Sequence, residues 1–433
     1  TGTLKNQVTS GNWLVRDILF YDASRRELYI QTANRVEGRN PYFRDICRVN
    51  IDTNELVEIF SPDKECVVIN HKNVHPECLV AYGKDIRNSQ GIAPSGEYIV
   101  STVSRVDLVP KTVLLDRKGK IILELETADV SGLLNNWQWP EPIVVKGDDN
   151  ETDIYAVIFR PSDFSEEKFY PIIDYSVDTS EGDFTPAGSF TNTQHCGVIY
   201  LSAAAYAELG FIVVMIEGRG LSRRNKAFFD DKDVKYPNGK NQLDRIAVIK
   251  QLAQQYPYMD INRVGVGEMQ SSCAALNGLL GHPDFYKVGV AHNPISDLRI
   301  VSSFYADEVS RERFDTSVIK KPIEDYVGNL SGKLLIMHGM MDATIPVAGT
   351  FRLIQAMEDA NKDFDMLLLP NGSHFLSSYA KRRSMDYFVK HLLGIEPPNE
   401  FKLTTSVDVM VQAIYGEQLA VATGNEEVGD MEE

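Results

Sequence analysis

The chain has 433 residues, of which 43% are hydrophobic and 24% charged, and its formal net charge at pH 7 is −17. This length fits two domains, and the composition is that of a globular protein with ample material for a core. No stretch approaches the ~20 uninterrupted apolar residues that a membrane-spanning helix requires. The acidic balance argues against a nucleic acid partner, because a phosphate backbone attracts clustered Lys and Arg.

The ends of the chain and its cysteines add few constraints. The sequence begins with Thr-Gly-Thr in place of an initiator Met, so we expect a processed or truncated chain, and the acidic residues 426–433 predict a solvated tail. The odd number of five cysteines argues against a complete disulfide framework, and neither C-x-x-C pairs nor other metal-ligand spacings occur. We therefore expect no metal and no other cofactor.

The first part of the chain is predicted to consist of short strands separated by turns. One set of four strands is expected at residues 13–21, 27–32, 45–51 and 56–60. A second set is expected at residues 78–82, 98–103, 112–116 and 121–124. Two four-strand meanders in succession predict two blades of a β-propeller, with an unrelated small all-β domain as the alternative. Because two blades cannot close a ring, we expect the other blades elsewhere in a longer chain or in another chain.

After residue 137 the pattern changes to alternating strands and helices. Compact apolar runs predict strands at residues 171–175, 211–217, 263–267, 288–291, 333–338 and 364–369. Amphipathic segments between them predict helices at residues 203–209, 242–255, 273–281, 348–360 and 378–393. This alternation predicts a doubly wound parallel sheet, whose functional sites lie at the carboxyl ends of the strands.

Several short motifs follow one another along the chain. They are Glu-Gly-Arg-Asn-Pro-Tyr (37–42), Ser-Arg-Val-Asp (104–107), Trp-Gln-Trp-Pro-Glu-Pro (137–142), Glu-Gly-Arg-Gly (217–220), Gly-Lys-Leu-Leu (332–335), His-Gly-Met-Met-Asp (338–342), Asn-Lys-Asp-Phe-Asp (361–365) and Asp-Tyr-Phe-Val (386–389). In sequence and in order these motifs resemble the dipeptidyl peptidase IV branch of the prolyl oligopeptidase family, and the resemblance extends over nearly all of residues 10–395.

The resemblance implies an N-terminal propeller over an α/β-hydrolase domain, with a serine triad between them. We expect the last two propeller blades over residues 1–128, the α/β-hydrolase domain over 129–397 and an acidic, disordered extension over 398–433. The expected partners are a peptide or protein ligand, a second copy of the chain and the missing blades. The expected location is extracytoplasmic.

The acid and the base of the triad are present at matching positions. A serine hydrolase needs a hydroxyl on a tight strand-to-helix turn, an imidazole that takes its proton and a carboxylate that orients the imidazole. Asp342 follows the strand that ends at His338, where the family carries its catalytic Asp. His374 follows the next strand, where the family carries its His.

The nucleophile position is altered. Where the family has Gly-x-Ser-x-Gly-Gly, residues 267–273 read Gly-Glu-Met-Gln-Ser-Ser-Cys. Alignment backward from residues 282–287 places Met269 at the nucleophile, and alignment forward from residues 263–266 places Gln270 there. A thioether and a carboxamide have no proton whose removal creates a nucleophile. Ser271 and Ser272 are weaker candidates, because they take the place of helix glycines and their hydroxyls would point away from the turn.

Other parts of the site also differ from the family pattern. Val177 takes the place of an oxyanion-hole Tyr, and Tyr175 could replace that Tyr only with a backbone shift. In the segment that lines the family's specificity pocket, Leu298 and Val301 stand at aromatic positions and Tyr305 remains aromatic.

Three functions remain open. The first and preferred one is a pseudopeptidase that acts by binding, because nucleophile, oxyanion donor and pocket change together and one scaffold can host unrelated roles. The second is an active serine-type exopeptidase with a displaced nucleophile, which the family implies would cleave Xaa-Pro or Xaa-Ala peptides. The third is a non-hydrolytic enzyme that uses Asp342 and His374 as a general base pair.

Overall fold

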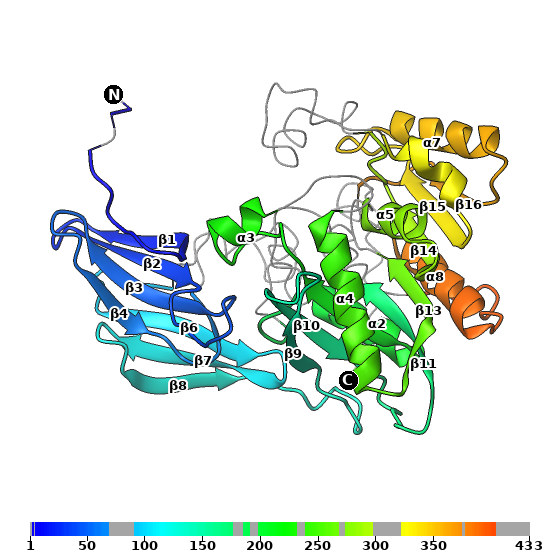
Figure 1. Ribbon diagram of the computed structural model, residues 1–433. Coiled ribbons are helices and arrows are strands. Elements are labelled where there is room, and N and C mark those ends of the chain that lie inside the picture. The colour runs from blue at the N-terminus through cyan, green and yellow to red at the C-terminus, as the bar shows by residue number, and fades with distance from the viewer. Residues whose placement is uncertain are drawn as a thin grey trace, which may run out of the picture.

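The computed structural model describes residues 2–3, 5–68, 91–175, 185–190, 198–231, 239–267, 273–297, 322–374 and 377–403. Figure 1 shows two parts, namely a pair of four-stranded sheets from the N-terminal portion and a larger sheet that carries helices. None of the helices in these ranges has the length and hydropathy of a membrane span.

The two small sheets are antiparallel meanders that pack face to face. The first contains β1 (Leu14–Asp22), β2 (Glu27–Ala33), β3 (Arg44–Asn50) and β4 (Leu56–Phe60), and the second contains β5 (Glu65–Val67), β6 (Tyr98–Arg105), β7 (Leu108–Asp116) and β8 (Ile121–Thr127). Tyr29 and Ile46 of the first sheet meet Ile99 and Leu115 of the second in one buried apolar cluster. This burial is the main favourable contribution to the stacking of the sheets.

The strand predictions in this part are confirmed wherever the structure describes them. The predicted strand at residues 78–82 lies outside the described residues. The second sheet instead begins with β5, which the sequence did not predict, because three residues are too few to show an alternating pattern.

The large sheet has eight strands in the order β16-β15-β14-β13-β11-β12-β10-β9. Its strands are β9 (Glu141–Lys146), β10 (Asp153–Phe159), β11 (Tyr170–Tyr175), β12 (Ile212–Glu217), β13 (Met259–Gly267), β14 (Tyr286–His292), β15 (Lys333–Gly339) and β16 (Asp365–Leu369). Strands β11 to β16 pair in parallel, whereas β10 is antiparallel to both of its neighbours. The doubly wound, mostly parallel sheet is therefore confirmed, and β9 and β10 extend it by an antiparallel edge.

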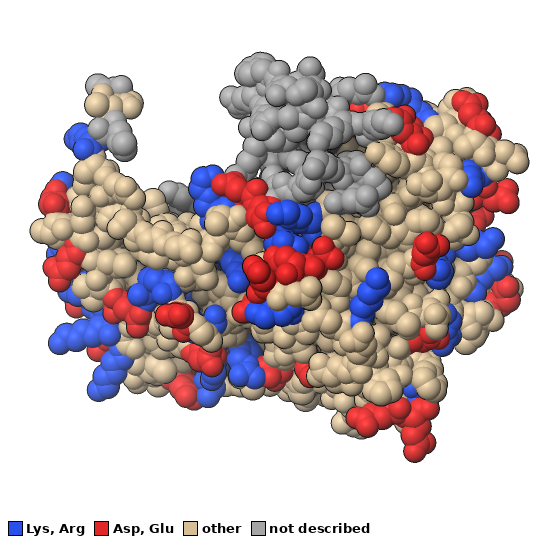
Figure 2. Space-filling model, in the orientation of Figure 1, with Lys and Arg blue, Asp and Glu red and all other residues tan. Residues whose placement is uncertain are grey.

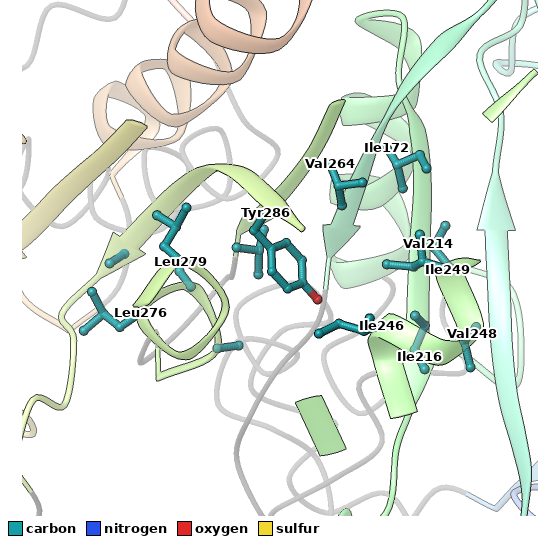
Figure 3. Close-up of a cluster of buried hydrophobic side chains, with 14 of the residues drawn as sticks. Ile172, Val214, Ile216, Ile246, Val248, Ile249, Val264, Leu276, Leu279 and Tyr286 are labelled. Carbon is teal, nitrogen blue, oxygen red and sulfur yellow. The ribbon is translucent and has the colours of Figure 1, made fainter. Parts of the chain in front are cut away.

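Helices cover both faces of this sheet. They are α2 (Val198–Glu208), α3 (Lys226–Asp230), α4 (Lys240–Gln255), α5 (Cys273–Gly281), the 3₁₀ helix η3 (Ile323–Asn329), α7 (Val347–Asp359), α8 (Ser378–Phe388) and the π-helical turn η4 (Val389–Leu393). Side chains of α4, α5 and α7 share one buried core, and those of α2, α8 and η4 share the core on the opposite face. In Figure 3, Tyr286 of β14 lies between Leu279 of α5 and Ile246 of α4.

The turn between β6 and β7 joins the two parts. Val106, which is 2% exposed, belongs to the same apolar core as α2, and the Tyr200 hydroxyl donates to its carbonyl oxygen at 3.1 Å. The hydroxyls of Ser104 and Ser189 lie 2.8 Å apart beside this turn. A buried apolar contact together with hydrogen bonds fixes the last small sheet against the hydrolase-like part.

Candidate functional site

Asp342 and His374 meet at the carboxyl edge of the large sheet. Asp342 follows β15 and His374 follows β16, and these strands are parallel neighbours, so the loops that leave them lie side by side. The His374 Nδ1–H donates to Asp342 Oδ2 at 2.9 Å. The Asp342 side chain is fully buried and that of His374 is 14% exposed. The carboxylate therefore orients the imidazole, as the acid of a triad does.

Backbone donors fix the second oxygen of Asp342. Its Oδ1 atom accepts from the main-chain N–H groups of Thr344 at 2.7 Å and Ile345 at 3.0 Å. Burial favours a raised pKa, but the hydrogen bonds from His374 and from these donors outweigh it and hold the pKa of Asp342 below its ordinary value. The carboxylate is thus charged at neutral pH, as the orienting member of a triad must be.

Two further histidines lie beside the pair. His338 Nε2 lies 3.1 Å from the Ile345 carbonyl oxygen, and its Nδ1 lies 2.7 Å from Thr350 Oγ1. Because a carbonyl can only accept, Nε2 carries the proton, and His338 braces the loop of Asp342. Burial, and after it the nearby His374 and His338, lowers the pKa of His292 at the end of β14 to about 3, so His292 is neutral at physiological pH.

Asn293 is a site residue that the sequence did not single out. It follows β14, is fully buried and hydrogen-bonds to the loops of both Asp342 and His374. The only local signal is the dipeptide Asn293-Pro294 after an apolar strand, which is an ordinary turn signal. Asn293 contacts segments that are distant from it in the chain, and no local sequence pattern indicates such contacts.

The strand and the helix that flank the nucleophile position lie where the sequence predicted. β13 ends at Gly267 and α5 begins at Cys273. A side chain on Gly267 would meet the ring of Phe388 at 2.8 Å, so this strand end packs directly on α8. The connecting residues Met269, Gln270, Ser271 and Ser272 lie outside the described residues.

The candidate oxyanion and pocket residues are described only in part. Tyr175 ends β11, is 4% exposed, and its ring packs on Tyr206 at a centroid distance of 5.5 Å in the apolar core beneath α2. This packing disfavours Tyr175 as an oxyanion donor. Val177, Leu298, Val301 and Tyr305 lie outside the described residues.

A buried polar network supports the end of β11. The Arg245 Nε–H donates to Asp174 Oδ2 at 3.0 Å, and both side chains are fully buried. The Tyr286 hydroxyl donates to the same oxygen at 2.7 Å and accepts from Gln242 Nε2 at 2.7 Å. Burial, and after it the charge of Asp174, raises the pKa of Tyr286 well above its ordinary value. The network ties β11, β14 and α4 together next to the carboxyl edge.

In the described ranges, no three His, Cys, Asp or Glu side chains are arranged to hold a metal ion. The imidazole of His374, which the buried carboxylate of Asp342 orients, can accept a proton.

Comparison with known proteins identifies relatives over most of the chain. Residues 199–395 match the prolyl oligopeptidase family. Mouse dipeptidyl peptidase 8 is 26% identical over 277 residues, which is 61% of this chain and 29% of that protein. Among solved structures, a dipeptidyl aminopeptidase IV-like protein of Bacteroides ovatus has a TM-score of 0.70 at 22% identity and covers 89% of this chain. Porphyromonas gingivalis dipeptidyl peptidase 4 has a TM-score of 0.69 at 20% identity and covers 90% of this chain.

These matches confirm the predicted fold class. This chain covers 51% and 52% of the two solved structures, so it spans about half of their length. The similarity to them shows the fold, namely an α/β hydrolase preceded by part of a β-propeller. The chain is therefore similar to the dipeptidyl peptidases of the prolyl oligopeptidase family, and residues 199–395 match that family.

Proposed function

We propose that this chain is a dipeptidyl peptidase IV-like homologue that no longer hydrolyses peptides and acts by binding a peptide or protein. The observation that carries the proposal is the segment between Gly267 and Cys273, where the family nucleophile belongs and where Met269 or Gln270 stands. Neither a thioether nor a carboxamide can attack a peptide carbonyl. Asp342 and His374 would then remain as an oriented base, while neither residue at the nucleophile position offers a hydroxyl.

Changes elsewhere in the expected site support the same conclusion. Val177 stands where the family has a Tyr that stabilises the oxyanion, and loss of one such donor typically slows an enzyme by ~10²–10³. Leu298 and Val301 replace aromatic residues of the expected specificity pocket. Several independent losses are more readily explained by relaxed selection on catalysis than by one inactivating substitution.

The surface of the chain is compatible with a protein or peptide ligand. On the face drawn in Figure 2, Lys and Arg side chains alternate with Asp and Glu side chains and do not form a continuous basic surface. The net charge of −17 opposes binding to nucleic acid. Further partners under this proposal are a second copy of the chain and the propeller blades that would complete the ring.

One observation favours a second candidate function. The hydrogen bond of 2.9 Å between His374 and Asp342 is what a working triad needs. An active exopeptidase would then use Ser271 or Ser272 as a displaced nucleophile on Xaa-Pro or Xaa-Ala peptides.

A fluorophosphonate probe separates the two candidates, because it labels only an activated serine. We expect no labelling of this chain under conditions in which an active dipeptidyl peptidase is labelled fully. The control variants are Ser271→Ala and Ser272→Ala. Labelling of the unmodified chain that either variant abolishes would establish the displaced nucleophile and overturn the proposal.

A further inference from the structure

Asn293 occupies a strained position between the two loops of the site. Its φ angle is +43°, in the left-handed region that Asn tolerates better than most side chains. Its main-chain N–H donates to the Met337 carbonyl oxygen at 2.8 Å, which anchors the residue on the neighbouring strand β15. The side chain is fully buried, so its orientation is determined by its hydrogen-bond partners.

The carboxamide of Asn293 uses both of its polar ends. Its Nδ2 group donates to the main-chain carbonyl oxygen of His374 at 2.9 Å. Its Oδ1 atom accepts from the main-chain N–H of Gly339 at 2.9 Å, three residues before Asp342. Because one partner can only accept and the other can only donate, the orientation of the amide group is fixed.

We propose that Asn293 is a positioning residue that holds Asp342 and His374 in hydrogen-bond contact. One rigid group joins the loop of the carboxylate to the main chain of the histidine, so the pair stays formed without a nucleophile or a substrate. This inference rests on the part of the proposed function that assigns Asp342 and His374 as the retained pair. It does not depend on whether the nucleophile is lost.

The test is made on the full chain with the Asn293→Gly variant. The substitution removes the side chain and with it both hydrogen bonds. The backbone conformation stays accessible, because glycine adopts a positive φ without strain. The measurement is the downfield proton NMR signal of the His374 Nδ1–H group, which is visible only while a hydrogen bond protects that proton from exchange. Its absence in His374→Gln identifies the signal.

We expect the signal to disappear in Asn293→Gly while circular dichroism shows an intact fold. The control is Asn329→Ala, which removes a comparable bond of 2.9 Å from an Asn carboxamide to the Leu280 carbonyl oxygen, away from the site. The control should keep the signal at its native position. A purely structural role for Asn293 would lower the melting temperature of Asn293→Gly, as in the control, without affecting the signal.

A second variant keeps the test decisive should Asn293→Gly fail to fold. Asn293→Asp retains the acceptor for Gly339 and lacks the donor to His374, so we expect it to lose the signal as well. A folded variant of either kind with a native chemical shift and line width overturns the inference. Fluorophosphonate labelling reports separately on the nucleophile, so failure of the proposed function leaves this result interpretable.

Discussion

The main chain at Gly339 packs directly against the main-chain carbonyl group of Ser373, and any side chain at Gly339 would overlap that oxygen and the carbonyl oxygen of Gly372. Ser373 immediately precedes His374, and Gly339 lies three residues before Asp342. The loops of the pair therefore meet through their backbones. Only glycine permits this approach, because a backbone neighbour cannot swing aside as the end of a flexible side chain can.

The first prediction concerns this contact. We expect Gly339→Ala to lower the free energy of unfolding by about 1–3 kcal/mol, the usual cost of overpacking, and to separate Asp342 from His374. Urea denaturation measures the first effect, and the His374 Nδ1–H signal measures the second. Gly132→Ala is the control, because a side chain there meets nothing within 4 Å, and it should change stability by less than about 0.5 kcal/mol. Equal stability of the two variants would contradict the packing described.

Much of the fold follows from local patterns in the sequence. Every residue of β12 (Ile212–Glu217) is buried. The continuous apolar run in this part of the sequence predicts such a fully buried strand, as parallel sheets contain. The antiparallel strand β9 was not predicted, because the run Glu-Pro-Ile-Val-Val-Lys is short and its residue types do not alternate between apolar and polar, although alternate side chains are exposed. Predicted helix 378–393 is present as α8 followed by the π-helical turn η4, a change in hydrogen bonding that periodicity does not reveal.

The candidate site could be predicted only where it follows strand ends. Asp342 and His374 were predicted to pair because the family resemblance points to both positions and each follows a buried strand, and parallel strands place their ends at one edge. Asn293 was not found, because its partner His374 is 81 residues away in the chain. Likewise, the role of His338 depends on how the following loop turns back to place the Ile345 carbonyl against its ring. Such contacts arise from tertiary packing.

The second prediction concerns acid stability. Burial and the nearby His374 and His338 lower the pKa of His292 from 6.5 to about 3, whereas the unfolded chain takes up this proton near the ordinary value. The unfolded state therefore binds more protons between these two values, so the contribution of His292 to stability is complete above pH 6.5 and falls as the pH drops toward 3.

His292→Gln tests this linkage, because glutamine does not titrate. Between about pH 6.5 and pH 4.5 we expect the native chain to lose about 2 kcal/mol more of its free energy of unfolding than the variant does. Urea denaturation at a series of pH values measures the difference. The window stops above the range in which Asp342 takes up a proton, and both proteins keep His338 and His374. Parallel pH curves for the two proteins would rule out a neutral, buried His292.

The third prediction concerns the ion pair beneath β11. Arg245→Met removes the cation from a fully buried carboxylate, and we expect a loss of about 3–5 kcal/mol in the free energy of unfolding. The matched control is Lys146→Met, because Lys146 and Asp153 form a pair whose side chains are 50% and 47% exposed. The control should cost less than about 1 kcal/mol. A small effect at Arg245 would mean that water reaches Asp174.

The last prediction concerns recovery of catalysis. If the turn between β13 and α5 and the pair of Asp342 and His374 persist while only the attacking group is missing, Met269→Ser or Gln270→Ser should restore some hydrolysis of a Gly-Pro anilide. The rate should remain at least ~10²-fold below that of an active dipeptidyl peptidase, because Val177 supplies no oxyanion donor.

Adding Val177→Tyr to the serine variant should raise turnover about tenfold or more. Val177→Tyr alone should have no measurable effect, because the members of a catalytic unit act together. The comparison uses both single variants and the double variant, each in a chain with the propeller completed. A double variant with an Asn293→Gly substitution added serves as the control for geometry, and it should lose the recovered activity. Turnover by the unmodified chain that Ser271→Ala or Ser272→Ala abolishes would instead identify that serine as the nucleophile, as the second candidate function requires.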